Sequence, residues 1–238
     1  MSSAIILAAG KSTRMQSELN KHLHMLHDKT VLQHIVDTVQ SVVDERIIIV
    51  VGYQKEKIKK SLKTFPHLIF VHQKEQLGTG HAVRVCKDVL NGLKGSTFIL
   101  PGDTPLIKPH TLQKMKKKFT ETKSLITLLV ACVHEPGSYG RIILNEAGNV
   151  EKIVEARDAT KDELAINVIN SGIYLADISF LFQALENITN ANEQREYYLT
   201  DIVAVAAQQK RVSCLVVDDE NEIIGINTMK DLERVRNL

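Results

Sequence analysis

Apolar residues in the first half of the chain form two kinds of run, which alternate along the sequence. Residues 4–8 and 46–51 are continuous apolar runs, which are typical of strands covered on both faces. Between them, Thr30 is expected to cap a helix whose apolar positions, from Val31 to Val43, recur about every 3.6 residues. Strands and helices that alternate with short connections predict a parallel, doubly wound sheet.

The alternation continues to the end of a fourth strand. A lysine-rich helix is expected at residues 55–63, followed by strands at 68–71 and 97–100. The helix between these two strands opens at Gly78-Thr79-Gly80 and runs to Leu90, and Thr79 is expected to cap it with its side chain. The last strand runs directly into Pro101-Gly102-Asp103. The lysine runs at residues 55–57 and 114–118 predict solvated helix faces.

The second half is less regular and richer in strand. The expected strands are 125–133, a hairpin of 141–144 with 150–154, and 166–175, which Asn170-Ser171-Gly172 interrupts; the expected helices are 177–186, 199–208 and 229–236. The chain therefore belongs to the α/β class, with a Rossmann-like doubly wound, mostly parallel sheet and a smaller β-rich portion. A length of 238 residues, 44% of them hydrophobic, suits one α/β domain or one domain with a small appendage.

Charge and cysteine content exclude several classes of function. Thirty basic against 28 acidic residues give a net charge of +2, which argues against a nucleic-acid or membrane-surface partner. The three cysteines, Cys86, Cys132 and Cys214, lie far apart and form no C-x-x-C pair, so neither a disulfide framework nor a zinc site is expected. No signal peptide is recognisable, and no stretch approaches the roughly 20 apolar residues of a membrane helix. The cytoplasm is the expected location.

The loop after the first strand carries the clearest candidate chemistry. Small residues up to Gly10 let backbone N–H groups approach a phosphate, while Lys11, Arg14 and Lys21 supply positive charge. A Walker A loop would need glycine at Ile5, and a Rossmann fingerprint would need three glycines where only Gly10 is present. Taken alone, the segment could also be an ordinary strand-to-helix turn with solvated cations.

Three polar signals fall at predicted strand ends, where doubly wound sheets bind ligands. They are the loop at residues 10–14, the loop at 78–80, and Asp103. A carboxylate at a strand tip suits Mg²⁺, although a turn aspartate is the alternative. His22, His24 and His27 have no partners at metal-ligand spacing and are interpreted as surface histidines, whereas His81 is assigned to packing or capping.

The stretch from Leu7 to Met15, followed by Lys21, resembles the signature loop of sugar-phosphate nucleotidyltransferases. Further family segments occur in order: Gln73–Ala82, Gly102-Asp103, Tyr139–Arg141, Val154-Glu155, Ile169–Gly172, Glu196–Asp201 and Gly225–Asn227. Together they resemble the uridyltransferase (pyrophosphorylase) domain of the bacterial bifunctional N-acetylglucosamine-1-phosphate uridyltransferase/glucosamine-1-phosphate acetyltransferases, over roughly residues 3–236.

The resemblance implies a role for each matching position. The uridine end of the substrate is held by Leu7, Ala8, Ala9, Gly10, Gln73, Gly78 and Thr79, and the phosphates are met by two catalytic residues, Arg14 and Lys21. Mg²⁺ is bound by Asp103 and Asn227, and Asn227 also contacts the substrate. The N-acetylglucosamine ring is recognised by Gly140, Glu155 and Asn170, and Gly102 lies against the nucleotide sugar. It also implies a fold of the nucleotide-diphospho-sugar transferase type. One domain over residues 1–238 is expected, with a nucleotide-binding part at about 1–108 and a sugar-binding, metal-completing part at about 109–238.

Three positions depart from the family pattern. Ser12 stands where the family usually has glycine, so phosphate approach is expected to be less close there. Asn20 replaces the usual proline, which removes a fixed φ and is expected to loosen the loop. Pro101 stands in place of a tyrosine, so one contact to the sugar nucleotide is lost. The family's second domain, a β-helix of hexapeptide repeats, has no counterpart in these 238 residues, so acetyl transfer is not expected.

The implied function is a Mg²⁺-dependent transfer that makes UDP-N-acetylglucosamine and pyrophosphate from UTP and N-acetylglucosamine 1-phosphate. Such a product is a precursor of cell-wall peptidoglycan and of lipopolysaccharide, and the enzyme is expected to be a monomer or weak homo-oligomer without nucleic-acid or membrane partners. Two alternatives remain: a cytidylyl- or guanylyltransferase acting on a sugar or alditol phosphate, and a nucleotide-sugar-binding sensor without turnover.

Overall fold

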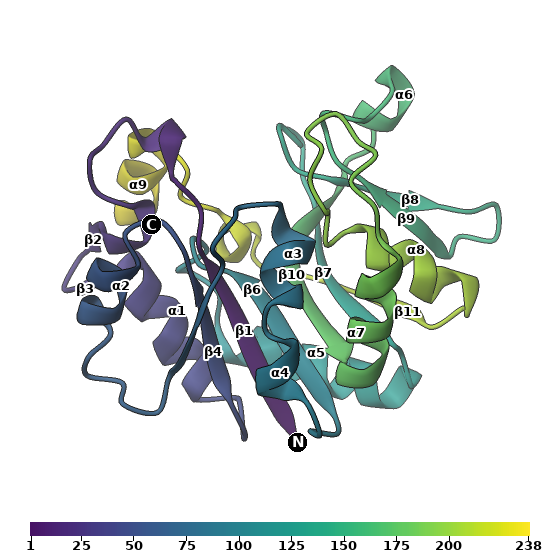
Figure 1. Ribbon diagram of the computed structural model, residues 1–238. Helices are drawn as coiled ribbons and strands as arrows, with labels where there is room; N and C mark the ends of the chain where they lie inside the picture. The colour runs from purple at the N-terminus through teal and green to yellow at the C-terminus, as the bar shows by residue number, and fades with distance from the viewer.

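A nine-stranded sheet forms the centre of the structure, a computed structural model that describes residues 1–238 (Figure 1). Its strands are β1 (Ser2–Ala8), β4 (Ile47–Val51), β5 (Ile69–His72), β6 (Ser96–Pro101), β7 (Ile126–Cys132), β8 (Arg141–Leu144), β9 (Val150–Val154), β10 (Val168–Asp177) and β11 (Val212–Val216). The main path has the order β11-β7-β10-β6-β1-β4-β5, while β8 and β9 branch from β10. A separate small hairpin joins β2 (Met25–Leu26) to β3 (Lys29–Thr30).

The pairing confirms the expected α/β class with a mostly parallel sheet. Strand β1 pairs in parallel with both neighbours, so that Ile5 lies beside Ile48 on one side and Ile99 on the other. Only β10 runs against the others of the main path, between β6 and β7. The register of β10 shifts between Asn170 and Tyr174, which confirms the interruption expected at that point.

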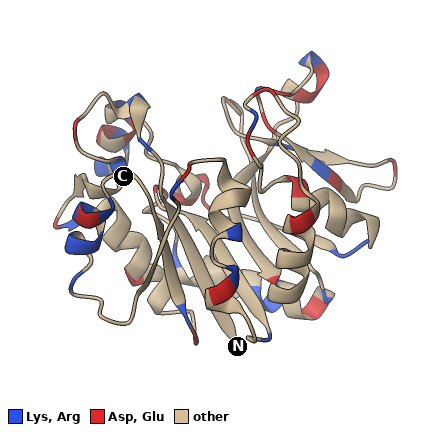
Figure 2. Ribbon diagram, in the orientation of Figure 1, with Lys and Arg blue, Asp and Glu red and all other residues tan.

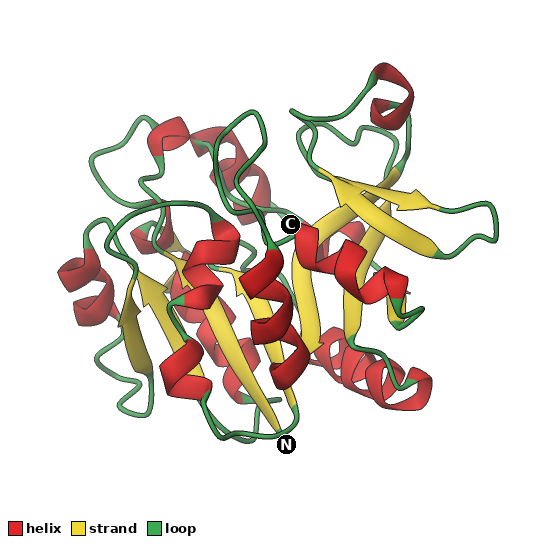
Figure 3. Cartoon of the chain, turned by 45° about the vertical axis from the view of Figure 1, so that its right-hand side comes forward, coloured by secondary structure: helices red, strands yellow, loops and turns green.

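Helices cover both faces of the sheet (Figures 1 and 3). They are α1 (Val31–Gln40), α2 (Lys55–Ser61), α3 (Thr79–Arg84), α4 (Lys87–Leu90), α5 (Pro109–Thr122), α6 (Lys161–Leu164), α7 (Ile178–Asn187), α8 (Asp201–Gln208) and α9 (Met229–Arg236). Alternate residues of β1 serve the two cores: Ile5 packs with the α7–α8 side, and Ile6 packs with the α1–α5 side. The part of β1 between the two cores, residues 4–8, is therefore apolar at every position, because neither face meets water.

Charged residues lie mostly on the outer helices, the loops and the β8–β9 arm rather than on the central strands of the sheet (Figure 2). The lysine run of α5 follows this rule, since Lys114 and Lys116 make ion pairs with Asp218 and Asp44 at the surface. The expected solvated helix faces are confirmed. No helix of the structure is both long enough and apolar enough to span a membrane.

Helix starts show one confirmed prediction and one error. Thr30 accepts a hydrogen bond from the Gln33 N–H while Gln33 returns one to the Thr30 N–H, a complete capping box for α1. Thr79 does not cap α3. Its hydroxyl instead accepts from the N–H of Leu199, 3.0 Å away, so the prediction of a local cap was wrong because a distant backbone donor takes the oxygen. The expected helix to Leu90 is also divided, into α3 and α4.

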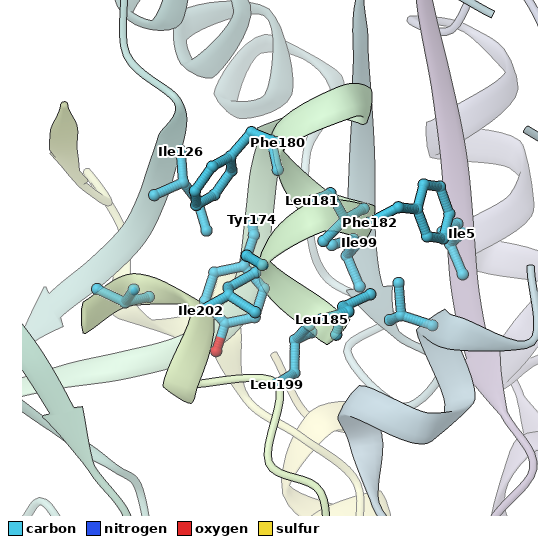
Figure 4. Close-up of a cluster of buried hydrophobic side chains, with 14 of the residues drawn as sticks. Ile5, Ile99, Ile126, Tyr174, Phe180, Leu181, Phe182, Leu185, Leu199 and Ile202 are labelled. Atoms are coloured by element: carbon cyan, nitrogen blue, oxygen red, sulfur yellow. The ribbon is translucent and has the colours of Figure 1, made fainter. Parts of the chain in front are cut away.

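The core on the α7–α8 side joins the second half of the chain to the sheet (Figure 4). Leu185 of α7 is fully buried among these side chains, beside Leu181 and Leu199.

We expect Leu185→Ala to lower the free energy of unfolding by about 2–5 kcal/mol, because the truncation removes buried methyl groups and leaves a cavity. Leu144→Ala, at a side chain that is 52% exposed, is the matched control and is expected to stay within about 0.5 kcal/mol. Urea unfolding of both variants measures the difference; equal losses would contradict the assigned core.

Candidate active site

The carboxyl ends of the parallel strands open into a cleft of about 700 Å³, a size suited to a nucleotide-sized ligand. Its walls come from the loops after β1 and β6 on one side and from the β8–β9 arm and the start of α8 on the other (Figure 1). The sequence-predicted residues that line it are Leu7, Ala9, Gly10, Arg14, Lys21, Gln73, Gly78, Thr79, Gly102, Asp103, Gly140, Glu155, Asn170 and Asn227. The expected convergence of strand-end loops is therefore present.

Ala8 is the predicted site residue that the structure does not bring to the cleft. It is fully buried in the core on the α1–α5 side and pairs with Val51 of β4. Side chains alternate between the faces of a strand, so Leu7 and Ala9 reach the cleft while Ala8 points the opposite way.

Lys21 stands at the centre of the polar end of the cleft. Its ammonium forms an ion pair with the Asp103 carboxylate and donates to the Asn227 Oδ1 over 2.8 Å. Arg14 donates to the same Asn227 oxygen over 2.9 Å. Three segments that are far apart in the sequence are thus joined at one cationic centre, and the backbone N–H of Ile226 reinforces the joint by donating to the Asp103 carbonyl oxygen.

The charge of Lys21 keeps Asp103 ionised in a buried position. Burial alone raises the pKa of a carboxyl, but the charge and the hydrogen bond of Lys21 outweigh it, so the pKa of Asp103 lies below its ordinary value. Asp103 is therefore a carboxylate at neutral pH, as a metal ligand must be.

The donors at this end fit a hard divalent cation. The Asp103 carboxylate and the Asn227 amide oxygen both contact one nitrogen, so they are close enough together to share one ion. One or two protein oxygens, completed by phosphate oxygens and water, make up a common Mg²⁺ environment. No cluster of three or more His, Cys, Asp or Glu side chains forms a metal site in the structure, and the amide of Asn227 lies outside that residue set.

The loop that carries Lys21 is held by Asn20, which is completely buried. The Asn20 side chain donates to the carbonyl oxygens of Gly10 and Tyr53, and its Oδ1 accepts from the Ser12 hydroxyl. The expectation that Asn20 loosens this loop was wrong, because a buried amide with partners on both sides replaces the rigidity of proline. Ser12 has φ of 58°, the left-handed conformation that favours glycine.

His22 was also misassigned as a surface histidine. It is 2% exposed and lines the cleft beside Gly102. Burial and the adjacent charge of Lys21 lower its pKa to about 3, so the ring is neutral. Sequence spacing missed it because the burial comes from segments that are distant along the chain. His24 is half-buried, and His27 is exposed as expected.

The second loop of the cleft is joined to the segment before α8. Gly80 N–H donates to the Tyr197 carbonyl oxygen, and Tyr197 N–H donates to Leu77. Gly78 has φ of +107°, and a Cβ there would lie 2.6 Å from the Tyr197 oxygen, so only glycine fits. Gln73 is buried and donates to the Gly78 carbonyl oxygen, and its side chain also contacts His81. Gln73 thus holds the loop while its Oε1 accepts no hydrogen bond within the protein.

Glu155 and Asn170 form the opposite end of the cleft. Thr200 donates to Glu155 Oε1 over 3.1 Å, and Asn170 donates to the Tyr174 hydroxyl over 2.7 Å. Burial raises the pKa of Glu155 above its ordinary value; the hydrogen bond from Thr200 opposes the rise, and Asp158 adds to it. Gly140 lies next to Glu155, whose Oε2 would be 3.6 Å from a Cβ placed there. This end offers hydrogen-bonding groups without a net positive charge, which suits a sugar.

Residues 4–166 match the MobA-like NTP transferase domain family, which is more than half of the chain. The chain belongs to this family. Its members transfer nucleotidyl groups, so this NTP transferase is a nucleotidyltransferase.

Relatives of known name agree with the family. The chain is 44% identical, over 94% of its length, to the "Bifunctional protein GlmU" of Geotalea daltonii and to that of Streptococcus pyogenes serotype M12. It covers 49% and 54% of these two relatives, so the NTP transferase spans about half the length of the curated proteins that it matches. A solved structure of UDP-glucose pyrophosphorylase with UDP-glucose shares the fold, with a TM-score of 0.78, 19% identity and coverage of 100% and 97% of the two chains.

Several residues of the NTP transferase cleft were not predicted. Gln76, Ser138, Tyr139 and Thr200 line it as well. The Tyr139 hydroxyl donates to the Ile223 carbonyl oxygen over 3.2 Å and so ties the β8 end of the cleft to the segment that carries Asn227. Tyr139 and Thr200 both lie within segments that resemble the family, and that was the available signal. Their contacts depend on tertiary packing.

Glu155 makes the stability of this NTP transferase depend on pH. Its pKa in the folded state is raised above that of an unfolded glutamate, so the folded protein loses stability relative to the unfolded chain as pH rises through the folded pKa. Glu155→Gln removes this effect. We expect the variant to gain stability relative to the wild type as pH rises from about 4 to 7. Denaturant unfolding at each pH measures the effect, with Glu151→Gln, an exposed change on the strand that Glu155 follows, as baseline. A difference in unfolding free energy between Glu155→Gln and the wild type that does not change with pH would contradict the raised pKa of Glu155.

Proposed function

We propose that this chain transfers UMP from UTP to N-acetylglucosamine 1-phosphate, releasing pyrophosphate and making UDP-N-acetylglucosamine. The observation that carries the proposal is the polarity of one cleft: Lys21, Arg14 and Asp103 gather at one end, and Glu155 with Asn170 lies at the other. A triphosphate requires the first end and an uncharged hexose requires the second. The similarity to bifunctional GlmU proteins supports the choice of substrates.

The two walls of the cleft come from different parts of the chain. Residues 1–108 supply the nucleotide-binding wall, and residues 109–238 supply the sugar-binding wall and the second oxygen ligand, Asn227. Both parts line one cleft, so we propose that residues 1–238 act as one nucleotidyltransferase domain, working as a monomer or weak homo-oligomer.

The reaction needs positioning and charge stabilisation more than proton transfer. A phosphate oxygen of the sugar phosphate forms a new bond to the α-phosphorus of UTP, and the bond from that phosphorus to the bridging oxygen of pyrophosphate breaks. The attacking oxygen is already anionic, so no general base is required. Lys21 and Arg14 are placed to stabilise the negative charge that shifts to the leaving pyrophosphate. Asp103 and Asn227 would hold Mg²⁺, which supplies further charge neutralisation when bound.

Uracil is selected by hydrogen bonds to the protein in this proposal. The free Oε1 of Gln73 can accept from the uracil N3–H, and backbone groups at Ala9 and Gly78 border the same part of the cleft. A base with the wrong donor pattern leaves buried polar groups without partners, which costs enough to discriminate strongly.

The proposal is tested by a matrix of four nucleoside triphosphates against several sugar 1-phosphates, with pyrophosphate release measured for each pair. We expect UTP with N-acetylglucosamine 1-phosphate to give the highest kcat/KM. A preference for CTP or GTP would assign the chain to a cytidylyl- or guanylyltransferase. Tight UDP-N-acetylglucosamine binding without pyrophosphate release from any pair would identify a sensor.

Removing either member of the central ion pair is expected to lower turnover strongly. We predict that Lys21→Ala and Asp103→Ala each reduce kcat by at least about 10²-fold, the scale for losing one preorganised electrostatic group. Lys29→Ala is the matched control, because this exposed lysine pairs with Asp37 away from the cleft. A folded variant at position 21 or 103 that keeps near-full activity would remove that residue from the mechanism.

Metal removal tests the proposed role of Asp103 and Asn227 as oxygen ligands separately from the roles of the other cleft residues. We expect chelation by EDTA to abolish pyrophosphate release and added Mg²⁺ to restore it. Asn227→Ala should then raise the Mg²⁺ concentration needed for half-maximal activity, because one oxygen ligand is lost. Activity that is unaffected by EDTA, or an unchanged Mg²⁺ requirement in the folded variant, would contradict this ligand pair.

A further inference from the structure

The buried amide of Asn20 has one orientation that satisfies its neighbours. Its Nδ2 lies 3.1 Å from the Gly10 carbonyl oxygen and 3.3 Å from that of Tyr53, and both oxygens can only accept. Its Oδ1 lies 3.1 Å from the backbone N–H of His22, which can only donate. Backbone groups on both sides therefore fix which atom of this amide is oxygen.

That orientation decides the tautomer of His22. The Nδ1 atom of His22 lies 2.7 Å from Asn20 Oδ1. Because Oδ1 can only accept, Nδ1 must carry the ring proton. In a neutral imidazole the other nitrogen, Nε2, then has a lone pair and no proton.

His22 lines the cleft, and the Nε2 edge of its ring lies against Gly102, which lines the cleft as well. A Cβ on Gly102 would come within 3.0 Å of Nε2, so the ring edge packs against the backbone that precedes Asp103. No protein group hydrogen-bonds to Nε2, whereas Nδ1 on the other side of the ring is paired with Asn20 Oδ1. The ring thus presents one unpaired acceptor beside the Lys21–Asp103 pair.

We propose that His22 Nε2 accepts a hydrogen bond from an O–H donor bound in the cleft, either a ribose hydroxyl of the nucleotide or a water molecule on the divalent cation. The inference deepens the proposed function and rests on it for the identity of the ligand. A lone pair repels phosphate oxygens, so His22 directs phosphates toward Lys21 and Arg14 and away from itself. Ser12 and Asn20, which both depart from the family pattern, support the same ring, since the Ser12 hydroxyl donates to the oxygen that fixes its tautomer.

The tautomer is tested without any activity. In the ¹⁵N-labelled full chain, two-dimensional NMR distinguishes a protonated from an unprotonated ring nitrogen. We expect His22 to show a protonated Nδ1 and an unprotonated Nε2 at neutral pH, with His22→Phe used to assign the signals. A protonated Nε2 overturns the inference, whatever substrate the enzyme uses.

The donor is identified by comparing a ribonucleoside triphosphate with its 2′-deoxy and 3′-deoxy forms, using the base that the substrate matrix favours. If a ribose hydroxyl donates, its removal lowers wild-type kcat/KM by about tenfold, the scale of one hydrogen bond, and has little further effect in His22→Phe. If a metal-bound water donates, the deoxy penalty is equal in both proteins, and His22→Phe raises the Mg²⁺ concentration for half-maximal activity several-fold. His22→Gln, which keeps an acceptor oxygen, should recover part of either effect.

The matched control is His67→Phe, at an exposed histidine. It should change neither the ratio of kcat/KM between ribonucleotide and deoxynucleotide nor the Mg²⁺ concentration for half-maximal activity. A folded His22→Phe protein with unchanged deoxy ratios and an unchanged Mg²⁺ requirement overturns the inference and leaves the substrate matrix unaffected. A wild type that fails with UTP but turns over another nucleotide overturns the proposed substrate and leaves the His22 test in place.

Discussion

The ammonium of Lys21 between Asp103 and Asn227 is the interaction on which the cleft depends. It exists because β1 and β6 are neighbouring parallel strands, so the loops at their carboxyl ends meet at one edge of the sheet. Asn227 is added from the far end of the chain, where the Ile226 N–H donates to the Asp103 carbonyl oxygen. A buried carboxylate needs a partner, and the same need draws three segments into one site.

Hydrogen bonds give the loop after β1 the order that proline and glycine give it in the family pattern. Ser12 holds a left-handed backbone conformation, and its hydroxyl connects to Asn20. Asn20 in turn connects to Gly10, Tyr53 and His22. The two substitutions are therefore one structural unit: the polar groups that each of them buries are satisfied largely by the other and by backbone.

The end of the cleft that holds Glu155 is built on a different principle. The β8–β9 arm and the start of α8 meet there, and their contact leaves Glu155 half-buried beside Thr200. Burial without a cation leaves Glu155 with a raised pKa, while Asp103 at the other end has a lowered one. Two carboxylates on one cleft thus differ in basicity because only one of them has a lysine as a partner.

The sequence by itself determined every strand of the large sheet except β11, most of the helices, the Thr30 cap, the break in β10 and the gathering of Gly10, Gly78 and Asp103 at one sheet edge. These follow from periodicity and from the rule for parallel strands, which are local or topological properties. Resemblance to a family added Gly140, Glu155, Asn170 and Asn227, whose placement spacing alone does not give. Only the tertiary structure decided that Ala8 faces the core, that Thr79 binds Leu199, and that His22 is buried with its Nδ1 on Asn20. The position of Ala8 depends on which face of β1 the cleft opens onto. The contacts of Thr79 and His22 depend on which distant group lies within hydrogen-bonding distance, and no local pattern encodes that.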